Sequence, residues 1–344
     1  MTVTVRSFAK INLGLYIGLA RADGFHQLQT VYQTIGLHDV IRVSVARGSG
    51  IEIRCGDARV PRDDSNTCWR IVELALRAYE INRRVVIEIE KRLPVQGGLG
   101  GASANAVATL LGLERALRKK LSAADKLRIA ADVGSDLPLF LVGGAVLGVG
   151  RGERVYPLQD LPAMDCVVVT PEVGVSTPKA FAQWDRRQGL NPLTSNPADA
   201  APKNLSSMAD PKLTVGDASD RMDGLGHGLS AWLSELHSGA PSDRSRRRGR
   251  AEDSLLALVR AGIENDFEQV VFPEYPELGE GKRALLRAGA KYASLSGSGS
   301  TLYGLFTSRD AAAKAVVRLR REDWSAQATR TLTRAQYWRR IFDC

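Results

Sequence analysis

The feature that most constrains this chain is a glycine-rich stretch that lies between a strand pattern and a helix pattern. It reads Pro94-Val95-Gln96-Gly97-Gly98-Leu99-Gly100-Gly101-Ala102-Ser103-Ala104-Asn105. The β-branched run 85–89 precedes it, and apolar residues recur at three- and four-residue steps from Val107 to Leu117. This order predicts a strand, a tight loop and a helix that packs one face on a sheet.

The glycine-rich stretch suits an anion. Glycines let a backbone approach an anion closely, and the first N–H groups of a helix are free to bind one. It is not a P-loop, because no Gly-Lys-Ser/Thr closes it, and Ser103 stands where a dinucleotide fingerprint has its third glycine. We expect phosphate binding, although a tight structural turn also fits the stretch when it is taken alone.

Three shorter segments carry residues that suit phosphate chemistry. They are Phe8-Ala9-Lys10-Ile11-Asn12, Gly134-Ser135-Asp136-Leu137-Pro138 and Leu295-Ser296-Gly297-Ser298-Gly299-Ser300-Thr301. A carboxylate beside a phosphate loop can take or orient the hydroxyl proton in phosphoryl transfer to an alcohol. Taken singly, Lys10 fits a solvated strand lysine, Asp136 a helix cap, and the serine-glycine run a flexible turn.

The pattern along the whole chain predicts an α+β protein. Strand patterns open the chain at 2–6, 10–20, 40–46 and 51–55, and helix patterns follow at 66–78, 107–117 and 123–131. From about residue 254, helix patterns alternate with strand-like runs at 293–295 and 301–306. A length of 344 residues suffices for two modest domains. The polar stretch 188–253 predicts an inserted, disordered segment.

Composition narrows the class of protein. No run approaches the roughly 20 apolar residues that span a bilayer, and the first residues lack a signal-peptide pattern, so we expect a cytoplasmic protein. The four cysteines are scattered with no CxxC pair, which favours reduced structural thiols over a zinc site. The formal net charge of +9 suits phosphate-rich ligands or nucleic acid, and several of its arginines gather at 244–250.

Taken together and in this order, the four segments resemble the three motifs and the catalytic acid of the galactokinase, homoserine kinase, mevalonate kinase and phosphomevalonate kinase (GHMP) superfamily. The resemblance implies a ribosomal-protein-S5-like N-terminal domain at 1–158 and a ferredoxin-like C-terminal domain at 159–344. It also implies an active site in the cleft between them.

Within that superfamily, Arg21-Ala22-Asp23-Gly24-Phe25-His26-Gln27-Leu28-Gln29-Thr30 closely resembles the cytidine-binding segment of 4-diphosphocytidyl-methylerythritol kinases. The resemblance implies that Phe25 and Tyr32 sandwich the cytosine and that His26 hydrogen-bonds its edge. The implied reaction is ATP-dependent phosphorylation of the 2-hydroxyl of 4-diphosphocytidyl-2-C-methyl-D-erythritol, in the non-mevalonate route to isoprenoid precursors.

The resemblance also assigns roles residue by residue. It implies Lys10 and Asp136 as the catalytic pair, with Asn12, Thr177 and Pro178 beside the acceptor substrate. The implied ATP-binding residues are Asn66, Lys91, Pro94, Gly97, Gly98, Leu99, Gly100, Gly101, Ala102, Ser103, Ala104, Gly297 and Ser298. Mg²⁺ is expected with ATP, but no metal ligand is assigned, since Ala104 lacks a hydroxyl that the family often has in its loop.

Two alternatives remain. Another kinase of the superfamily would keep the phosphate loop and act on a different acceptor, so the segment 21–30 separates the two readings. A non-catalytic nucleic-acid-binding protein would explain the basic charge, but no nucleic-acid-reading motif accompanies it. We expect ATP and a small cytidyl alcohol as partners, no nucleic acid or membrane, and a monomer or weak homodimer.

Overall fold

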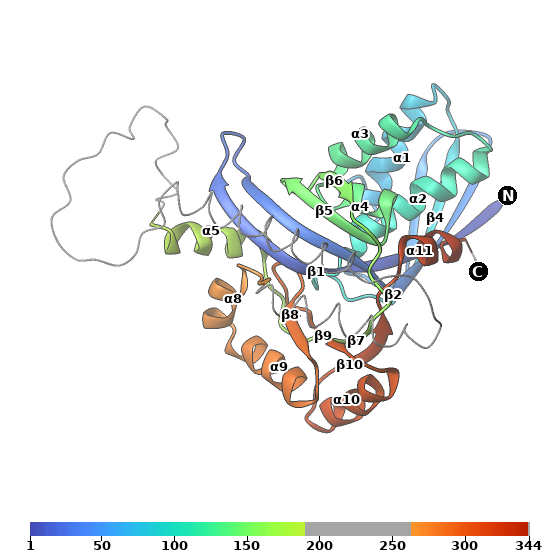
Figure 1. The fold of residues 1–344 in the computed structure, drawn as a ribbon. Helices are drawn as coiled ribbons and strands as arrows, with labels where there is room; N and C mark the ends of the chain where they lie inside the picture. The colour runs from blue at the N-terminus through green and yellow to red at the C-terminus, as the bar shows by residue number, and fades with distance from the viewer. Residues whose placement is uncertain (190–262, 343–344) are drawn as a thin grey trace, which may run out of the picture.

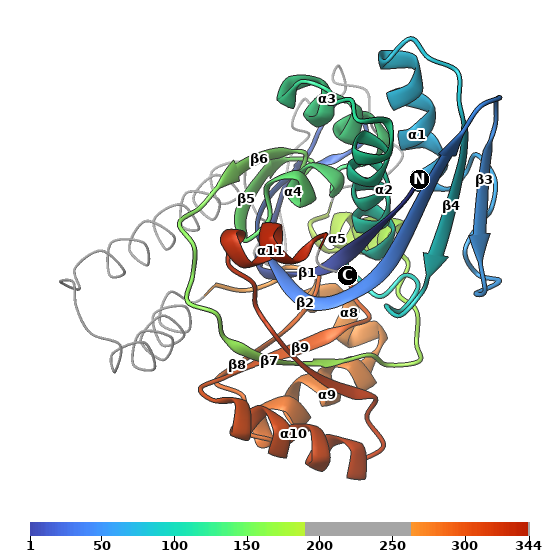
Figure 2. The ribbon, with the colours of Figure 1, turned by 90° about the vertical axis from the view of Figure 1, so that its right-hand side faces the viewer.

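The computed structural model describes residues 1–189 and 263–342 of the chain, and it contains two β-sheets with helices packed on them (Figures 1 and 2). The larger sheet has the order β3-β4-β2-β5-β6, with β1 paired to β2, and the smaller has the order β10-β7-β9-β8. The strands are β1 (Thr2–Ala20), β2 (His26–Ala46), β3 (Ile51–Cys55), β4 (Arg84–Glu90), β5 (Ala145–Gly150), β6 (Arg154–Pro157), β7 (Asp165–Val169), β8 (Tyr292–Leu295), β9 (Leu302–Phe306) and β10 (Ala326–Arg330). The helices are α1 (Thr67–Ala78), α2 (Gly101–Leu117), α3 (Ala123–Val133), α4 (Leu137–Val142), α5 (Thr177–Arg187), α8 (Glu268–Glu274), α9 (Pro276–Arg287), α10 (Arg309–Arg321) and α11 (Arg334–Arg340).

The long antiparallel hairpin of β1 and β2 is the spine of the molecule (Figure 1). Its turn is closed by Asp23, which accepts a hydrogen bond from the Phe25 N–H and pairs with Arg21. The register of the hairpin shifts between Phe8 and Lys10 and again between Asn12 and Gly14. Such irregularities re-aim side chains, and these two flank the segment that carries Lys10 and Asn12.

Helices α1, α2 and α3 cover one face of the larger sheet (Figure 2). Eleven consecutive residues of α2, from Ala104 to Glu114, are buried, so the helix is enclosed rather than laid on a surface. It lies close to β2: a Cβ at Gly112 would be 2.8 Å from the Val43 side chain. The helices predicted from the sequence at 66–78, 107–117 and 123–131 are confirmed, although α2 begins six residues earlier, at Gly101, and α3 runs two residues further.

The smaller sheet is covered on both faces. Helices α9 and α10 pack on one face, where Val167, Leu285 and Leu319 share an apolar cluster. On the other face Val168 and Leu305 meet Ile11 of the hairpin. Because the hairpin contributes to this second core as well as to the first, the two sheets form one packed body rather than two separate units.

The end of the chain returns to the first sheet. Tyr337 of α11 is 2% exposed, donates a hydrogen bond to the Phe140 carbonyl and belongs to the same apolar cluster as α1 and α2. The family resemblance implies a second domain at 159–344, and this division stays a prediction; within that stretch, α11 packs on the first sheet. The segment predicted at 188–253 lies outside the described residues, except for Gln188 and Gly189.

Candidate active site

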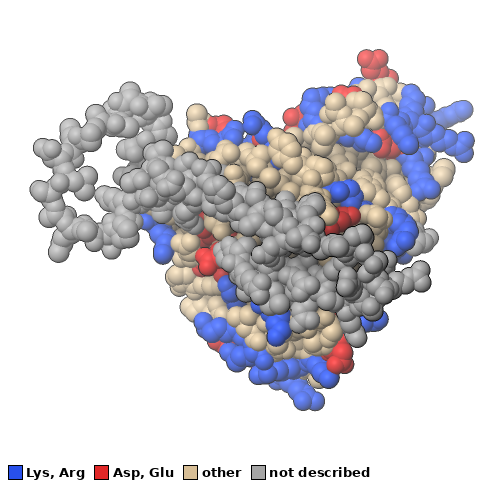
Figure 3. Space-filling view, viewed as in Figure 1, with Lys and Arg blue, Asp and Glu red and all other residues tan. Residues whose placement is uncertain are grey.

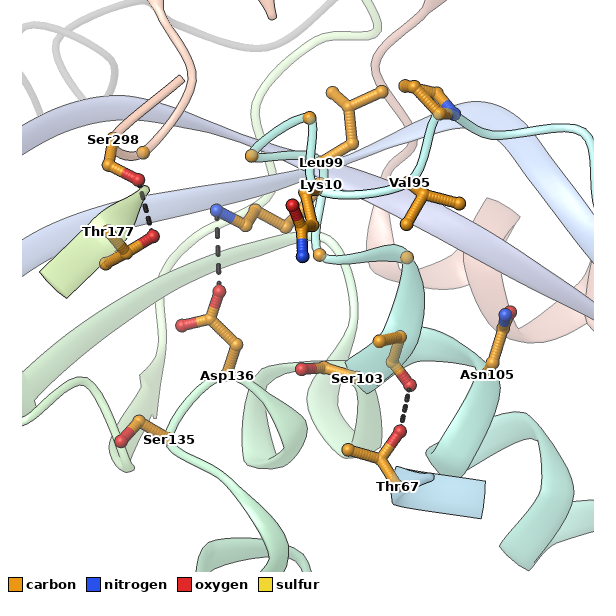
Figure 4. A pocket seen from close by; sticks show the side chains of 18 of the residues that line it. Lys10, Thr67, Val95, Leu99, Ser103, Asn105, Ser135, Asp136, Thr177 and Ser298 are labelled. Carbon is orange, nitrogen blue, oxygen red and sulfur yellow. Dashed lines mark hydrogen bonds and ion pairs between the residues drawn. The ribbon is translucent and has the colours of Figure 1, made fainter. Parts of the chain in front are cut away.

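A cavity of about 620 Å³ opens between the hairpin, the N-terminus of α2 and the segments that lead into and out of the smaller sheet. It is long and has distinct ends. Residues 94–103 and Asn105 line its middle, Phe25 and His26 line one end, and Val60, Asn66 and Ile89 line the other. The segment around Gly297 and Ser298 closes the side opposite α2, as Figure 4 shows.

A lysine and a carboxylate face each other in this cavity (Figure 4). The Lys10 Nζ lies 3.4 Å from Asp136 Oδ2 and donates a hydrogen bond of 2.7 Å to Asn12 Oδ1. Lys10 is 3% exposed, whereas the Asp136 side chain is 34% exposed. Asp136 precedes α4 but caps no backbone N–H with its side chain, so its carboxylate is not used as a helix cap.

Tyr32 holds the other oxygen of that carboxylate. Its hydroxyl donates a hydrogen bond of 3.0 Å to Asp136 Oδ1. Burial raises the pKa of the Tyr32 hydroxyl well above its ordinary value, and the charge of Asp136 raises it further. The hydroxyl therefore stays protonated at neutral pH and works as a donor that orients Asp136.

Asn12 fixes the lysine from the opposite side. Its amide donates to Thr30 Oγ1 at 2.7 Å, which leaves the amide oxygen for Lys10. Its backbone carbonyl accepts from the Tyr303 hydroxyl of the smaller sheet at 2.6 Å. Contacts from both sheets thus set the position of Lys10.

The loop 94–100, which we call the first glycine loop, is shaped by positions where only glycine fits. Gly98 has φ +76°, and a Cβ there would lie 2.1 Å from the Ser296 carbonyl oxygen. Gly100, at φ +68°, is the N-cap of α2 and provides no side-chain cap, so the first N–H groups of a buried 17-residue helix face the cavity unoccupied by a capping side chain. Such a helix start attracts anions.

The run 296–301, which we call the second glycine loop, packs directly on the first. The Ser296 hydroxyl donates to the Gly98 carbonyl, and the Thr301 N–H donates to the Gly97 carbonyl. Asn265 anchors the run by donating to the carbonyls of Leu295 and Gly297, both at 2.8 Å. The two loops form one assembly, although about two hundred residues separate them in the sequence.

Aromatic side chains gather at the hairpin end of the cavity. Phe25 is 49% exposed, and the Arg151 guanidinium lies 4.8 Å from its ring centroid. His26 stacks on Phe181 of α5 with 4.8 Å between centroids and 11° between planes. The His26 Nε2 lies 2.6 Å from Asp185 Oδ1 on the same helix. An exposed ring beside two parallel rings is suited to a flat ligand.

Apolar and polar side chains together line the opposite end, with Val60 and Ile89 beside Asn66 and Lys91. Asn66 there caps α1: its oxygen accepts from the Cys68 N–H and its amide donates to the Pro61 carbonyl. Lys91 is 2.7 Å from the fully buried Asp39 carboxylate. Asp39 also accepts from the N–H groups of Arg92 and Leu93 at 2.7 Å and from the Asn105 amide, so it fastens the entry of the first glycine loop to α2.

Comparison with known proteins agrees with this geometry. The GHMP kinase N-terminal domain model matches residues 66–144, and the GHMP kinase C-terminal model matches residues 250–326. A 4-diphosphocytidyl-2-C-methyl-D-erythritol kinase of Solibacter usitatus is 34% identical over 91% of this chain and 84% of its own length. One of Rhodococcus jostii is 38% identical over 75% of this chain and 80% of its own length. This chain belongs to the 4-diphosphocytidyl-2-C-methyl-D-erythritol kinase family.

Solved structures extend the comparison. A crystal structure of 4-(cytidine 5'-diphospho)-2C-methyl-D-erythritol kinase has a TM-score of 0.66 and 27% identity, covering 95% of this chain and 98% of that one. A homoserine kinase of Cytophaga hutchinsonii has a TM-score of 0.63 over 96% of this chain and 95% of its own, but at 20% identity it speaks for the fold alone.

Most residues that the family resemblance implied line the one cavity. Ala104 and Pro178 do not: the Ala104 methyl group points into the core beneath α2, and Pro178 lies in the first turn of α5, exposed. Tyr32 lines the cavity but is only 2% exposed, so it offers little ring face for stacking.

Sequence reasoning missed four residues at this site: Asp39, Arg151, Phe181 and Asp185. Phe181 and Asp185 could have been found from the spacing i, i+4 on a helix that follows Ser176-Thr177-Pro178, a common helix start. Asp39 and Arg151 carry no local signal, because their partners come from distant segments.

Among the described residues no group of three His, Cys, Asp or Glu could hold a metal, and no helix there is long and apolar enough to cross a bilayer.

Proposed function

We propose that this protein transfers the γ-phosphate of ATP to the 2-hydroxyl of 4-diphosphocytidyl-2-C-methyl-D-erythritol. The observation that carries this is the Lys10–Asp136 pair, which lies between an anion-binding helix start and an aromatic pocket in a single cavity. The middle of the cavity fits a triphosphate, and the aromatic end fits a planar base.

In the transfer, Asp136 accepts the proton of the acceptor hydroxyl as the oxygen attacks the γ-phosphorus. The bond from that phosphorus to the β,γ-bridging oxygen breaks, and ADP leaves with this oxygen. Lys10, whose Nζ lies 3.4 Å from that carboxylate, stabilises negative charge on the transferred group. Tyr32 and Asn12 hold the two catalytic side chains in place through their hydrogen bonds. Since phosphoryl transfer depends mainly on positioning and electrostatics, this fixed constellation supplies most of what the reaction needs.

ATP places its phosphates on the first glycine loop and the α2 N-terminus in this proposal. The end of the cavity near Val60 and Ile89 receives the adenine. Mg²⁺ keeps most of its waters and binds chiefly through substrate phosphates in such sites, so the lack of a dedicated carboxylate cluster among the described residues fits a metal that neutralises the triphosphate. The Ser103 hydroxyl, which lines the cavity, is the protein group we assign nearest to it.

We place the cytosine between Phe25 and Phe181, in contrast to the sequence-based expectation of Phe25 and Tyr32. Phe25 offers an exposed face and Phe181 lines the same end of the cavity, whereas the Tyr32 hydroxyl is committed to Asp136. The diphosphate of the acceptor then lies along the turn 150–152. No carboxylate among the described residues pairs with the Arg151 side chain, which leaves it available to phosphate.

The enzyme as proposed needs ATP, Mg²⁺ and its acceptor, and acts as a monomer or weak homodimer in the cytoplasm. One chain provides both glycine loops, the catalytic pair and the aromatic end, so no second copy is required to complete the site.

Purified protein tested with Mg-ATP against four acceptors decides the proposal: 4-diphosphocytidyl-methylerythritol, mevalonate, homoserine and galactose. We expect ATP consumption only with the cytidyl compound. Turnover with another acceptor instead would keep the phosphate site and refute the aromatic end as a cytidine site.

A further inference from the structure

The histidine at the aromatic end is held from behind by a carboxylate. His26 and Phe181 line the cavity, but Asp185 does not, so the Nε2–Asp185 contact of 2.6 Å faces away from the ligand space. Asp185 is one helical turn after Phe181, which stacks on the same imidazole ring. One turn of α5 therefore fixes both the plane and the rotation of the ring.

A carboxylate can only accept a hydrogen bond, so the contact requires a proton on Nε2. In the neutral ring the proton cannot also be on Nδ1, which becomes an acceptor. No described residue hydrogen-bonds Nδ1, and this atom is not fully buried. The one polar ring atom left over is therefore open to a ligand.

We propose that Asp185 sets the pyrimidine specificity of the enzyme by holding His26 in the tautomer whose Nδ1 accepts. This rests on the proposed function and adds the residue that selects the base. Cytosine carries an amino group at its 4-position, which donates to such an acceptor, whereas uracil carries an oxygen that would face it lone pair to lone pair. Asp185 is a positioning residue, because it acts only through His26.

The exchange Asp185→Asn separates this role from a structural one. A side-chain amide can rotate and donate to Nε2, which allows the other tautomer, with a proton on Nδ1 that suits the uracil oxygen. Using calorimetry at pH 8, where imidazole is ordinarily neutral, we expect CDP to bind D185N roughly 3–10-fold more weakly than it binds the unaltered enzyme. UDP should bind D185N more tightly than the unaltered enzyme, by a similar factor.

Gln183→Leu is the matched control. It removes an amide from the same helix, and Gln183 does not line the cavity, so both affinities should stay within about twofold. The gain for UDP is the decisive readout, since loss of packing weakens ligands but does not strengthen one. Equal weakening of CDP and UDP, or no change in either, would overturn the role of Asp185.

A ligand series on the unaltered enzyme tests the same idea without any variant. The diphosphate of the 2-pyrimidinone riboside, which lacks the 4-amino group, should bind roughly 3–10-fold more weakly than CDP. Equal binding would refute acceptance at Nδ1. Failure of the unaltered enzyme to bind CDP at all, or to prefer it to UDP, would instead refute the cytidyl acceptor of the proposed function.

Discussion

At the scale of single residues, hydrogen bonds and an ion pair hold the polar side chains of the site in place. Lys10, Asp136, Asn12 and Tyr32 form one hydrogen-bonded chain from the hairpin to the start of α4. The sequence predicted the catalytic pair through its family motifs. It could not predict that Tyr32 hydrogen-bonds Asp136 rather than stacking on cytosine, because this depends on where the Tyr32 hydroxyl lies in the folded chain.

Replacing Asp136 by Asn removes the proposed proton acceptor and keeps the shape of the side chain. We expect turnover to fall by at least ~100-fold while ATP affinity is largely retained. Steady-state kinetics and nucleotide-binding calorimetry measure the two effects. Turnover close to that of the unaltered enzyme would contradict the assignment of Asp136.

Two aromatic exchanges distinguish the roles of Phe181 and Tyr32. Phe181→Ala should raise the KM for the cytidyl acceptor by roughly tenfold, because a stacking face is worth on the order of 1–3 kcal/mol. Tyr32→Phe should lower kcat and leave that KM nearly unchanged, since only the contact with Asp136 is lost. The reverse pattern would return the stacking role to Tyr32.

At the scale of elements, the strands and helices with a regular apolar period could be predicted. Elements that lack this period, and depend on packing against distant segments, could not. Helix α2 was found from its period and its glycine start. Helix α5 was missed because only Ala180 and Trp184 are buried in it, too few to give a periodic signal. The strand β5 was missed because Gly148 and Gly150 interrupt its pattern.

The contact between the two glycine loops makes Gly98 a sensitive position. Gly98→Ala adds a methyl group 2.1 Å from the Ser296 carbonyl at positive φ, so the loops must separate. We expect the KM for ATP to rise by roughly tenfold or more. Gly289→Ala, also at positive φ but with open space around its Cβ, is the control and should leave the KM unchanged.

Asp39 of β2 contacts both the segment 91–93 and α2, so its removal should reduce stability more than activity. Asp39→Ala leaves the Lys91 ammonium, 10% exposed, without its partner. We expect a loss of about 3–5 kcal/mol in the free energy of unfolding, measured by urea denaturation. Glu73→Ala, which breaks the exposed pair with Arg77, should cost less than about 1 kcal/mol.

At the scale of the whole molecule, the family resemblance predicted a two-domain α+β protein with the site in the cleft between the domains, and the two sheets with their shared cavity agree with that fold. Charge was less informative. Figure 3 shows Lys and Arg in separate groups on this face, with Asp and Glu between them, rather than in one continuous basic surface. The return of α11 to the first sheet could not be predicted, because its seven residues carry no signal for a distant partner.

The packing of α11 has a measurable weight. Tyr337→Ala removes a buried ring that contacts Gly143 and Phe8, together with its hydrogen bond to Phe140. We expect about 3–5 kcal/mol of lost stability in thermal or urea unfolding. Trp338→Ala, at a neighbouring side chain that is 37% exposed, should cost distinctly less, and equal effects would contradict the assigned packing.

The return of α11 also bears on how the protein is made. The Arg6 N–H donates to the Ile341 carbonyl, so the beginning and end of the chain meet in the first layer. Helix α11, which completes the first layer (the larger sheet and its helices), leaves the ribosome only after the second layer (the smaller sheet and its helices) has been synthesised. The first layer therefore waits, incomplete and with apolar surface uncovered, while the second has time to fold. In this sense the second layer is an insertion within the first, and joining the two ends and cutting elsewhere would give a chain that completes each layer in turn.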